Sequence, residues 1–145
     1  FRSDALVRVP LREPGGIMVN EPADLLAAAR IAFRVSAAAT SEARRMVTKT
    51  RSRGTTWGQI GESLVAAGII AADSTNPAWD AFRWAAPEPS MPFDEIRLGC
   101  RCATCQQWIS DIGPEAGHPT DSERGHGPDC ARHAAEITAW EQSWG

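Results

Sequence analysis

Long hydrophobic runs are absent from this chain of 145 residues. No apolar stretch approaches the roughly 18 residues that a membrane-spanning helix needs, so we expect no membrane partner. A basic segment followed by an apolar core, which would indicate secretion, is also missing, and we expect a cytoplasmic protein. The length and a hydrophobic content of 43% fit one ordinary domain or two small ones. The natural start could lie at Met18, in which case residues 1–17 are not native.

Cysteine and histidine are absent outside one segment. All four cysteines and all three histidines lie between residues 100 and 133. A small secreted scaffold usually spreads its cysteines along the chain, whereas Cys100, Cys102 and Cys105 crowd one another. This distribution favours a metal site in a reducing compartment over a set of disulfides.

The spacing within this segment is typical of a zinc site. Cys102 and Cys105 have two residues between them, so one tight turn can place both thiolates on a tetrahedral ion. His126 and Cys130 complete a set of four ligands. We expect Cys130 in the first turn of the last helix, where the positive end of the helix dipole favours a thiolate. The predicted cofactor is one structural Zn²⁺ ion held by these four residues.

Three other side chains compete for the same ion. His133 could take the place of His126, Cys100 could replace a histidine, and His118 could ligate from its loop. Their simpler interpretations are a surface helix residue for His133, an inward-facing strand side chain for Cys100 and a hydrogen-bonding loop residue for His118.

Signatures of catalysis are missing. The thiolate-rich set closes at four ligands and keeps no open position for a reactive water molecule. The sequence contains no His-Glu-x-x-His run, no recognisable nucleophile with a base, and no phosphate-binding loop. We therefore do not expect an enzyme.

Charge is divided unevenly along the chain. Residues 22–56 carry seven basic and two acidic side chains, a net charge of +5. Residues 57–145 carry five basic and thirteen acidic side chains, a net charge of −8. Such asymmetry often marks a surface that faces a polyanion, although a solvated helix face gives the same pattern.

Helical patterns fill the first half of the chain. Small and apolar residues recur with helical spacing from about position 22 to position 50, which predicts one long amphipathic helix, or two helices if it breaks near residues 36–41. Gly54 is expected to end this pattern. A second helix follows, with a capping box formed by Thr56 and Gln59 and with Gly61 permitting a close helix contact.

Three further elements are expected after Gly68. Asn76 can cap a third helix with Pro77 at its first position. Residues 93–102 alternate apolar and polar side chains, which predicts a strand. A last helix opens at Pro128 or Asp129, and its apolar face is formed by Ala134, Ile137, Trp140 and Trp144.

The run RSRGTTWGQIGESL, residues 51–64, resembles the first helix of the helix-turn-helix in small actinobacterial DNA-binding proteins. The resemblance rests on a Gly-x-x-Trp-x-x-Ile-Gly-x-x-Leu pattern, formed here by Gly54, Trp57, Ile60, Gly61 and Leu64. It implies that residues 76–84 occupy the place of the recognition helix. The connecting segment departs from the family, because it is much longer than the usual turn of about three residues.

The cysteine-rich segment resembles a second actinobacterial element, a zinc-ribbon-like tail with the pattern C-x-x-C…I-x-D-x-GP…HP-x-D…GH…C. The matching residues are Cys102, Cys105, Ile109, Asp111, Gly113, Pro114, His118, Pro119, Asp121, Gly125, His126 and Cys130. The resemblance favours His126 over His133 as a ligand. It implies regulatory or DNA-associated work and no assigned reaction.

These patterns predict a mainly α protein in four parts. The parts are an N-terminal arm (1–21), a helical, helix-turn-helix-like domain (22–86), a linker (87–92) and a small zinc-stabilised β-hairpin/helix module (93–145).

The expected function is binding of double-stranded DNA, as a transcriptional regulator. The candidate phosphate contacts are Arg44, Arg45, Lys49, Arg51 and Arg53, and Arg83 on the third helix is the candidate base contact. The alternative is a zinc-stabilised adaptor that binds a protein partner, or a dimerisation module in which the long apolar stripe pairs with a second copy as a coiled coil.

Overall fold

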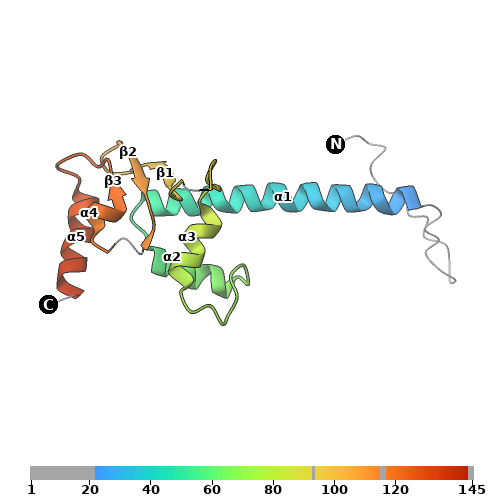
Figure 1. Ribbon diagram of the computed structural model, residues 1–145, viewed down its shortest axis with the longest axis horizontal. Coiled ribbons are helices and arrows are strands. Elements are labelled where there is room, and N and C mark those ends of the chain that lie inside the picture. Colours follow the sequence, from blue (N-terminus) through green and yellow to red (C-terminus); the bar gives the residue numbers. More distant parts are fainter. Residues whose placement is uncertain (1–21, 93, 115–116, 144–145) are drawn as a thin grey trace. The chain divides into compact units, whose positions relative to one another are not determined.

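The computed structural model describes residues 22–92, 94–114 and 117–143. In chain order its elements are α1 (Pro22–Ser52), α2 (Trp57–Ala66), α3 (Pro77–Ala85), β1 (Leu98–Arg101), β2 (Trp108–Asp111), α4 (Pro119–Ser122), β3 (Glu123–Arg124) and α5 (Ala131–Ser143) (Figure 1). The predicted mainly α composition is confirmed. The expected arm at residues 1–21 and the side chain of Trp144 lie outside the described residues.

The long helix α1 is continuous. The Ser/Thr cluster that could have broken it is accommodated within the helix, where the Thr40 hydroxyl donates to the Ser36 carbonyl oxygen at 3.0 Å. Beyond the helix end, Gly54 adopts a φ of 99°, a left-handed conformation that glycine adopts at little cost. None of the helices in the described part of the chain is long and apolar enough to cross a bilayer.

The chain divides into two compact units after Ala43, and residues 87–92, the predicted linker, lie within the second unit. Within residues 44–143, Leu98 of β1 belongs to the same buried cluster as Trp57 and Phe82 of the two short helices. Gly113, which follows β2, lies against the Phe82 ring. The α2–α3 pair and the sheet therefore share one core.

The short helices α2 and α3 begin and meet as their sequences predict. Thr56 and Gln59 form the capping box at the start of α2. The Asn76 side chain accepts a hydrogen bond from the backbone of α3, and Pro77 occupies the first turn. Gly61 lies directly against the Pro77 backbone, so the absence of a side chain sets the distance between the two helices.

The three strands form an antiparallel sheet in the order β1-β2-β3. The predicted strand at residues 93–102 pairs only over Leu98–Arg101, because its partner β2 has four residues and the chain then turns at Cys102. In Figure 1, α4 and α5 lie together beside the strands. The inward sheet face is built from alternate residues, since Cys100, Ile109 and Glu123 are buried.

The last helix, α5, begins later than predicted. Cys130 precedes it and supplies the carbonyl that accepts from the Ala134 amide at 3.0 Å, so Cys130 caps the helix and does not lie in its first turn. The buried side of α5 also differs from the prediction, because Ala134 is exposed and Arg132 is buried. The reason is the set of ion pairs that Arg132 makes.

Replacing Gly61 by alanine should destabilise the protein. The added methyl carbon would lie 2.5 Å from both the carbonyl carbon and the oxygen of Pro77, so α2 and α3 would have to separate. Overpacking of this kind costs roughly 1–3 kcal/mol. Urea unfolding followed by tryptophan fluorescence measures the loss in free energy of unfolding.

Gly58→Ala is the matched control. A methyl group at Gly58 has the Thr56 hydroxyl as its nearest neighbour, at 3.8 Å, so it fits without movement. This variant should keep its stability or gain up to about 1 kcal/mol from helix propensity. Equal losses for the two variants would contradict the close helix contact.

Candidate metal centre

Four potential metal ligands come together between β1, β3 and α5. The ligand atoms of Cys102, Cys105, His126 and Cys130 all lie within 4.8 Å of one another. The Cys102 and Cys130 sulfurs are 3.8 Å apart, and the Cys105 sulfur is 3.7 Å from His126 Nδ1. A tetrahedral ion with metal–sulfur bonds of about 2.3 Å requires sulfur–sulfur separations of roughly 3.8 Å. The four predicted ligands therefore fit a tetrahedral metal ion.

Two local turns set this geometry. After β1, the Cys102 amide donates to the Gln107 carbonyl at 2.9 Å, and Gln106 adopts a left-handed φ of 61°, which folds the Cys-x-x-Cys segment back on itself. Before His126, Gly125 has a φ of 103°, and a side chain there would collide with the Trp108 carbonyl. The glycine lets the chain pass close to β2 and deliver His126 to the sulfurs.

The thiols differ in how easily they ionise. Hydrogen bonds from the backbone amides of Gly127 and Gln107 lower the pKa of Cys105 to about 7. Burial opposes ionisation of Cys102, but amide hydrogen bonds outweigh it and the pKa is lowered. Burial raises the pKa of Cys130, so in the metal-free protein this thiol holds its proton longest of the three. A bound cation would shift all three toward the thiolate.

Cys100 lies outside the ligand cluster. It faces inward from β1, and burial raises its pKa to about 11, which keeps the thiol neutral at physiological pH. This agrees with its interpretation as an inward-facing strand side chain.

The other two histidines also have different environments. His118 caps α4, where its Nδ1 accepts from the Thr120 amide at 3.2 Å. His133 stacks on the His126 ring with centroids 4.2 Å apart, and its Nδ1 is buried without a hydrogen-bond partner among the described atoms. Glu123, His126 and His133 form a second possible ligand group, but Arg132 already binds both Glu123 oxygens. The group with three cysteines is the better metal site.

Glu123 orients the histidine ligand. Its Oε2 lies 2.7 Å from His126 Nε2, which leaves Nδ1 directed at the sulfurs. Burial opposes ionisation of Glu123, but hydrogen bonds from Arg132 and the charge of Arg51 outweigh it and lower the pKa to about 2. Glu123 is therefore an anion at neutral pH and can accept a hydrogen bond from the Nε2–H group of a metal-bound imidazole.

Arg51 joins three elements around this carboxylate. Its Nε donates to Asp111 at 2.8 Å, its Nη1 lies 3.0 Å from Glu136, and its Nη2 pairs with Glu123. Asp111 also accepts from the Trp57 indole nitrogen at 2.9 Å. The guanidinium thereby connects the end of α1 to β2, β3 and α5.

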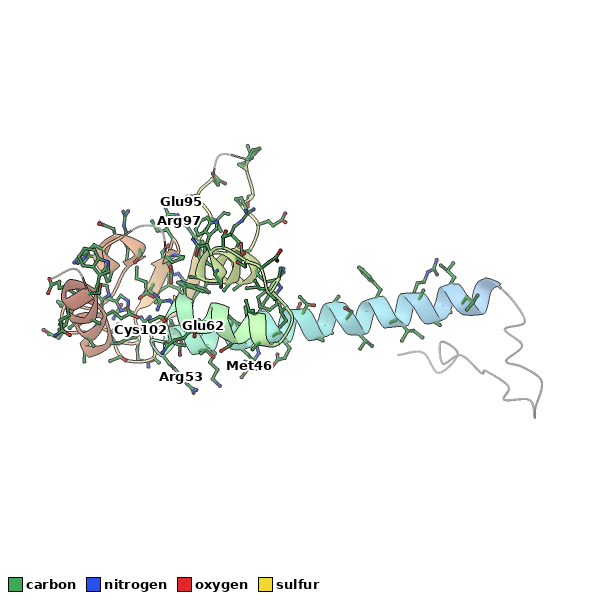
Figure 2. The ribbon with its side chains drawn as sticks, turned by 90° about the horizontal axis from the view of Figure 1, so that it is seen from below. Met46, Arg53, Glu62, Glu95, Arg97 and Cys102 are labelled. Atoms are coloured by element: carbon green, nitrogen blue, oxygen red, sulfur yellow. The ribbon has the colours of Figure 1, made fainter. Side chains whose placement is uncertain are left out.

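This position corrects the predicted role of Arg51 as a phosphate contact. Its exposed fraction is 6%, and its donors already face buried carboxylates. Arg44 is exposed with its guanidinium over the Trp84 ring. The remaining predicted DNA contacts, all exposed, are Arg45, Lys49, Arg53 and Arg83. Figure 2 shows the Arg53 side chain projecting away from the ribbon.

The sequence reasoning missed the charged residues that surround the ligands: Asp111, Glu123, Arg132 and Glu136. Asp111 stands in the zinc-ribbon-like pattern, but that pattern gives it no partner. Glu123 lies three residues before His126, a spacing that could have suggested a carboxylate–histidine pair. Nothing in the sequence next to Arg132 or Glu136 indicates which residues they pair with.

Comparisons with protein-family models, with curated proteins and with solved structures found no match to this chain.

Changing Cys130 to serine should abolish stable metal binding. Serine fills nearly the same space, but its hydroxyl does not ionise at neutral pH and is a poor ligand for a soft site. We expect elemental analysis to find one metal ion per chain in the unchanged protein and far less in this variant after dialysis against a chelator. Cys100→Ser is the control, since Cys100 is similarly buried but outside the cluster. Equal metal loss in both variants would contradict the assignment.

Replacing Arg51 by methionine should cost about 3–5 kcal/mol of unfolding free energy. Methionine preserves much of the volume, so the expected loss comes mainly from leaving Asp111 and Glu123 buried without their cation. Arg53→Met removes the same charge from an exposed position nearby and should change stability by no more than roughly 0.5 kcal/mol. Chemical unfolding of both variants provides the comparison, and similar stabilities would refute the proposed importance of the buried network.

Proposed function

We propose that this chain is a DNA-binding protein with a role in transcriptional regulation, held in its active shape by one structural zinc ion. The observation that carries the proposal is the separation of charge across the sheet. Asp111 and Glu123 face inward and are paired with arginines, whereas Arg101 and Arg124 are exposed. The outer face of the sheet is therefore basic, although its strands carry two acidic and two basic side chains.

Zinc is the metal that suits the ligand set. Three thiols and one imidazole at tetrahedral spacing match the structural sites that zinc forms. Four protein ligands fill such a site, so the ion would contribute stability and not chemistry. Elemental analysis of the purified protein tests this assignment. Zinc at one ion per chain supports it, and a folded protein without metal contradicts it.

Exposed cations at the end of α1 would supply phosphate contacts. Lys49 and Arg53 lie on the surface there, beside Arg44 and Arg45. Helix α3 is a weaker candidate for reading bases, because its exposed Arg83 shares the surface with Asp80, which also accepts from the Ser74 hydroxyl at 2.6 Å. Backbone contacts would therefore dominate binding, which makes affinity strongly dependent on salt.

A second candidate function is dimerisation or protein binding through α1. Within residues 22–43, Leu25, Phe33 and Val35 have exposed fractions of 58%, 75% and 52%. A helix that exposes its apolar residues in this way is suited to a partner helix. This candidate stands if the chain forms dimers and does not bind DNA.

Lys49→Glu and Arg53→Glu should each weaken binding to a random-sequence duplex. Each substitution removes a cation that neutralises a phosphate, so fewer counterions are released on binding. The slope of log affinity against log salt concentration should therefore become shallower by about 0.9 for each phosphate no longer neutralised. Fluorescence anisotropy with a labelled duplex over a range of salt concentrations measures both the affinity and the slope.

Arg34→Glu is the matched control for charge. It makes the same change of two units on the same helix, at an exposed position within residues 22–43. The affinity of Arg34→Glu for the duplex should stay close to that of the unchanged protein. The affinities of Lys49→Glu and Arg53→Glu should differ from it more. Absence of duplex binding at low salt, together with a dimeric native mass, would replace the DNA proposal by the adaptor candidate.

A further inference from the structure

A basic groove lies between the last turns of α1 and the strands β1 and β2. Its volume is about 350 Å³. Its lining includes Arg45 and Lys49 from the helix and Arg101 and Trp108 from the strands, and no acidic side chain occurs among its described lining residues. The sequence reasoning named the two helix residues as DNA contacts but assigned no role to Arg101 or Trp108.

Trp108 is unusually exposed for a tryptophan. Its exposed fraction is 64%, and it pairs across the strands with Arg101. The ring lies over Gly99, since a methyl carbon at that glycine would lie 2.6 Å from ring atom Cζ2 and 3.3 Å from Nε1. One side of the indole thus rests on the β1 backbone while much of the ring remains open to solvent.

The exposed sheet face extends the basic surface beyond the groove. Arg124 of β3 is also exposed, and it is paired with Ser110 of β2 in the sheet. Arg97 and Glu95 neutralise each other at the surface with an ion pair of 2.6 Å (Figure 2). Cations and one open aromatic ring therefore dominate this face.

We infer that the groove binds a single-stranded segment of DNA, with a base stacked on Trp108 and phosphates held by Lys49 and Arg101. This inference rests on the proposed function and makes its substrate more specific. Aromatic rings on a sheet surface bind unpaired bases by stacking, and flanking cations hold the backbone. Bases within an intact duplex already stack on their neighbours, so Trp108 can contribute this interaction only where the strands are open.

Trp108→Ala should weaken binding of a labelled thymidine oligonucleotide by roughly ten-fold or more, because base–aromatic stacking makes a contribution of that order. Binding to a duplex of equal length should change much less. Trp108→Phe retains an aromatic face and should recover most of the affinity. Fluorescence anisotropy at one fixed low salt concentration gives all the dissociation constants.

Gly99→Ala tests whether single-strand binding requires the Trp108 ring to lie against Gly99. The added methyl group displaces the indole from the strand without removing it, so single-strand affinity should fall between those of the unchanged protein and Trp108→Ala. Arg101→Glu should weaken single-strand binding, whereas Arg34→Glu makes the same charge change at an exposed position within residues 22–43 and should leave it nearly unchanged. Metal content and circular dichroism establish that each variant is folded.

The outcomes separate the inference from the function on which it rests. Preferential loss of single-strand binding in Trp108→Ala, with recovery by phenylalanine, supports the groove. Duplex binding that persists while single-strand affinity is indifferent to Trp108 overturns the inference and leaves DNA binding intact. Failure of the unchanged protein to bind either form of DNA overturns both.

Discussion

The guanidinium group of Arg51 is the point on which the 44–143 unit depends. Three carboxylates from separate parts of the chain, Asp111, Glu123 and Glu136, surround it. Burying so many charges is costly unless every one is paired, and removal of the central cation would leave the acids unsatisfied. Because Glu123 also holds the histidine of the metal centre, the ion pairs and the ligand cluster form one continuous arrangement.

This arrangement explains why the net charge of residues 57–145 does not describe the outer face of the sheet. Their net charge of −8 suggests a surface that would repel DNA. Asp111 and Glu123 are nevertheless inside, where Arg51 and Arg132 neutralise them. The sheet thus places its acids on one face and leaves its cations on the other, because side chains alternate along each strand. The net charge of a segment includes both faces of the sheet, whereas a binding partner contacts only the outer face.

Features that depend on neighbouring residues could be predicted from the sequence. The capping box of α2, the cap of α3 and the close contact at Gly61 each follow from a few adjacent positions. The clustered ligands could be predicted because this spacing of cysteines and histidine is typical of a metal site. The role of Arg51 could not be predicted, because its carboxylate partners lie 60 or more residues away and arginine is more often exposed. The core shared across residues 87–92 could not be predicted for a similar reason, because the place of Leu98 in the same buried cluster as Trp57 and Phe82 leaves no pattern in either segment alone.

The metal centre and the basic groove share the same few residues of chain. Arg101 immediately precedes Cys102, and its guanidinium donates to the Gln106 carbonyl within the metal-binding turn at 2.9 Å. The Ala103 amide of that turn donates to the Ser52 carbonyl at the end of α1 at 3.0 Å, which fixes the turn against the helix that carries Lys49. A hairpin whose two strands have four residues each cannot hold this geometry by itself, because so few residues form no core of their own. Closing the turn around the proposed ion would therefore fix where Arg101 lies relative to Lys49, and would make the metal a condition for the shape of the proposed binding surface.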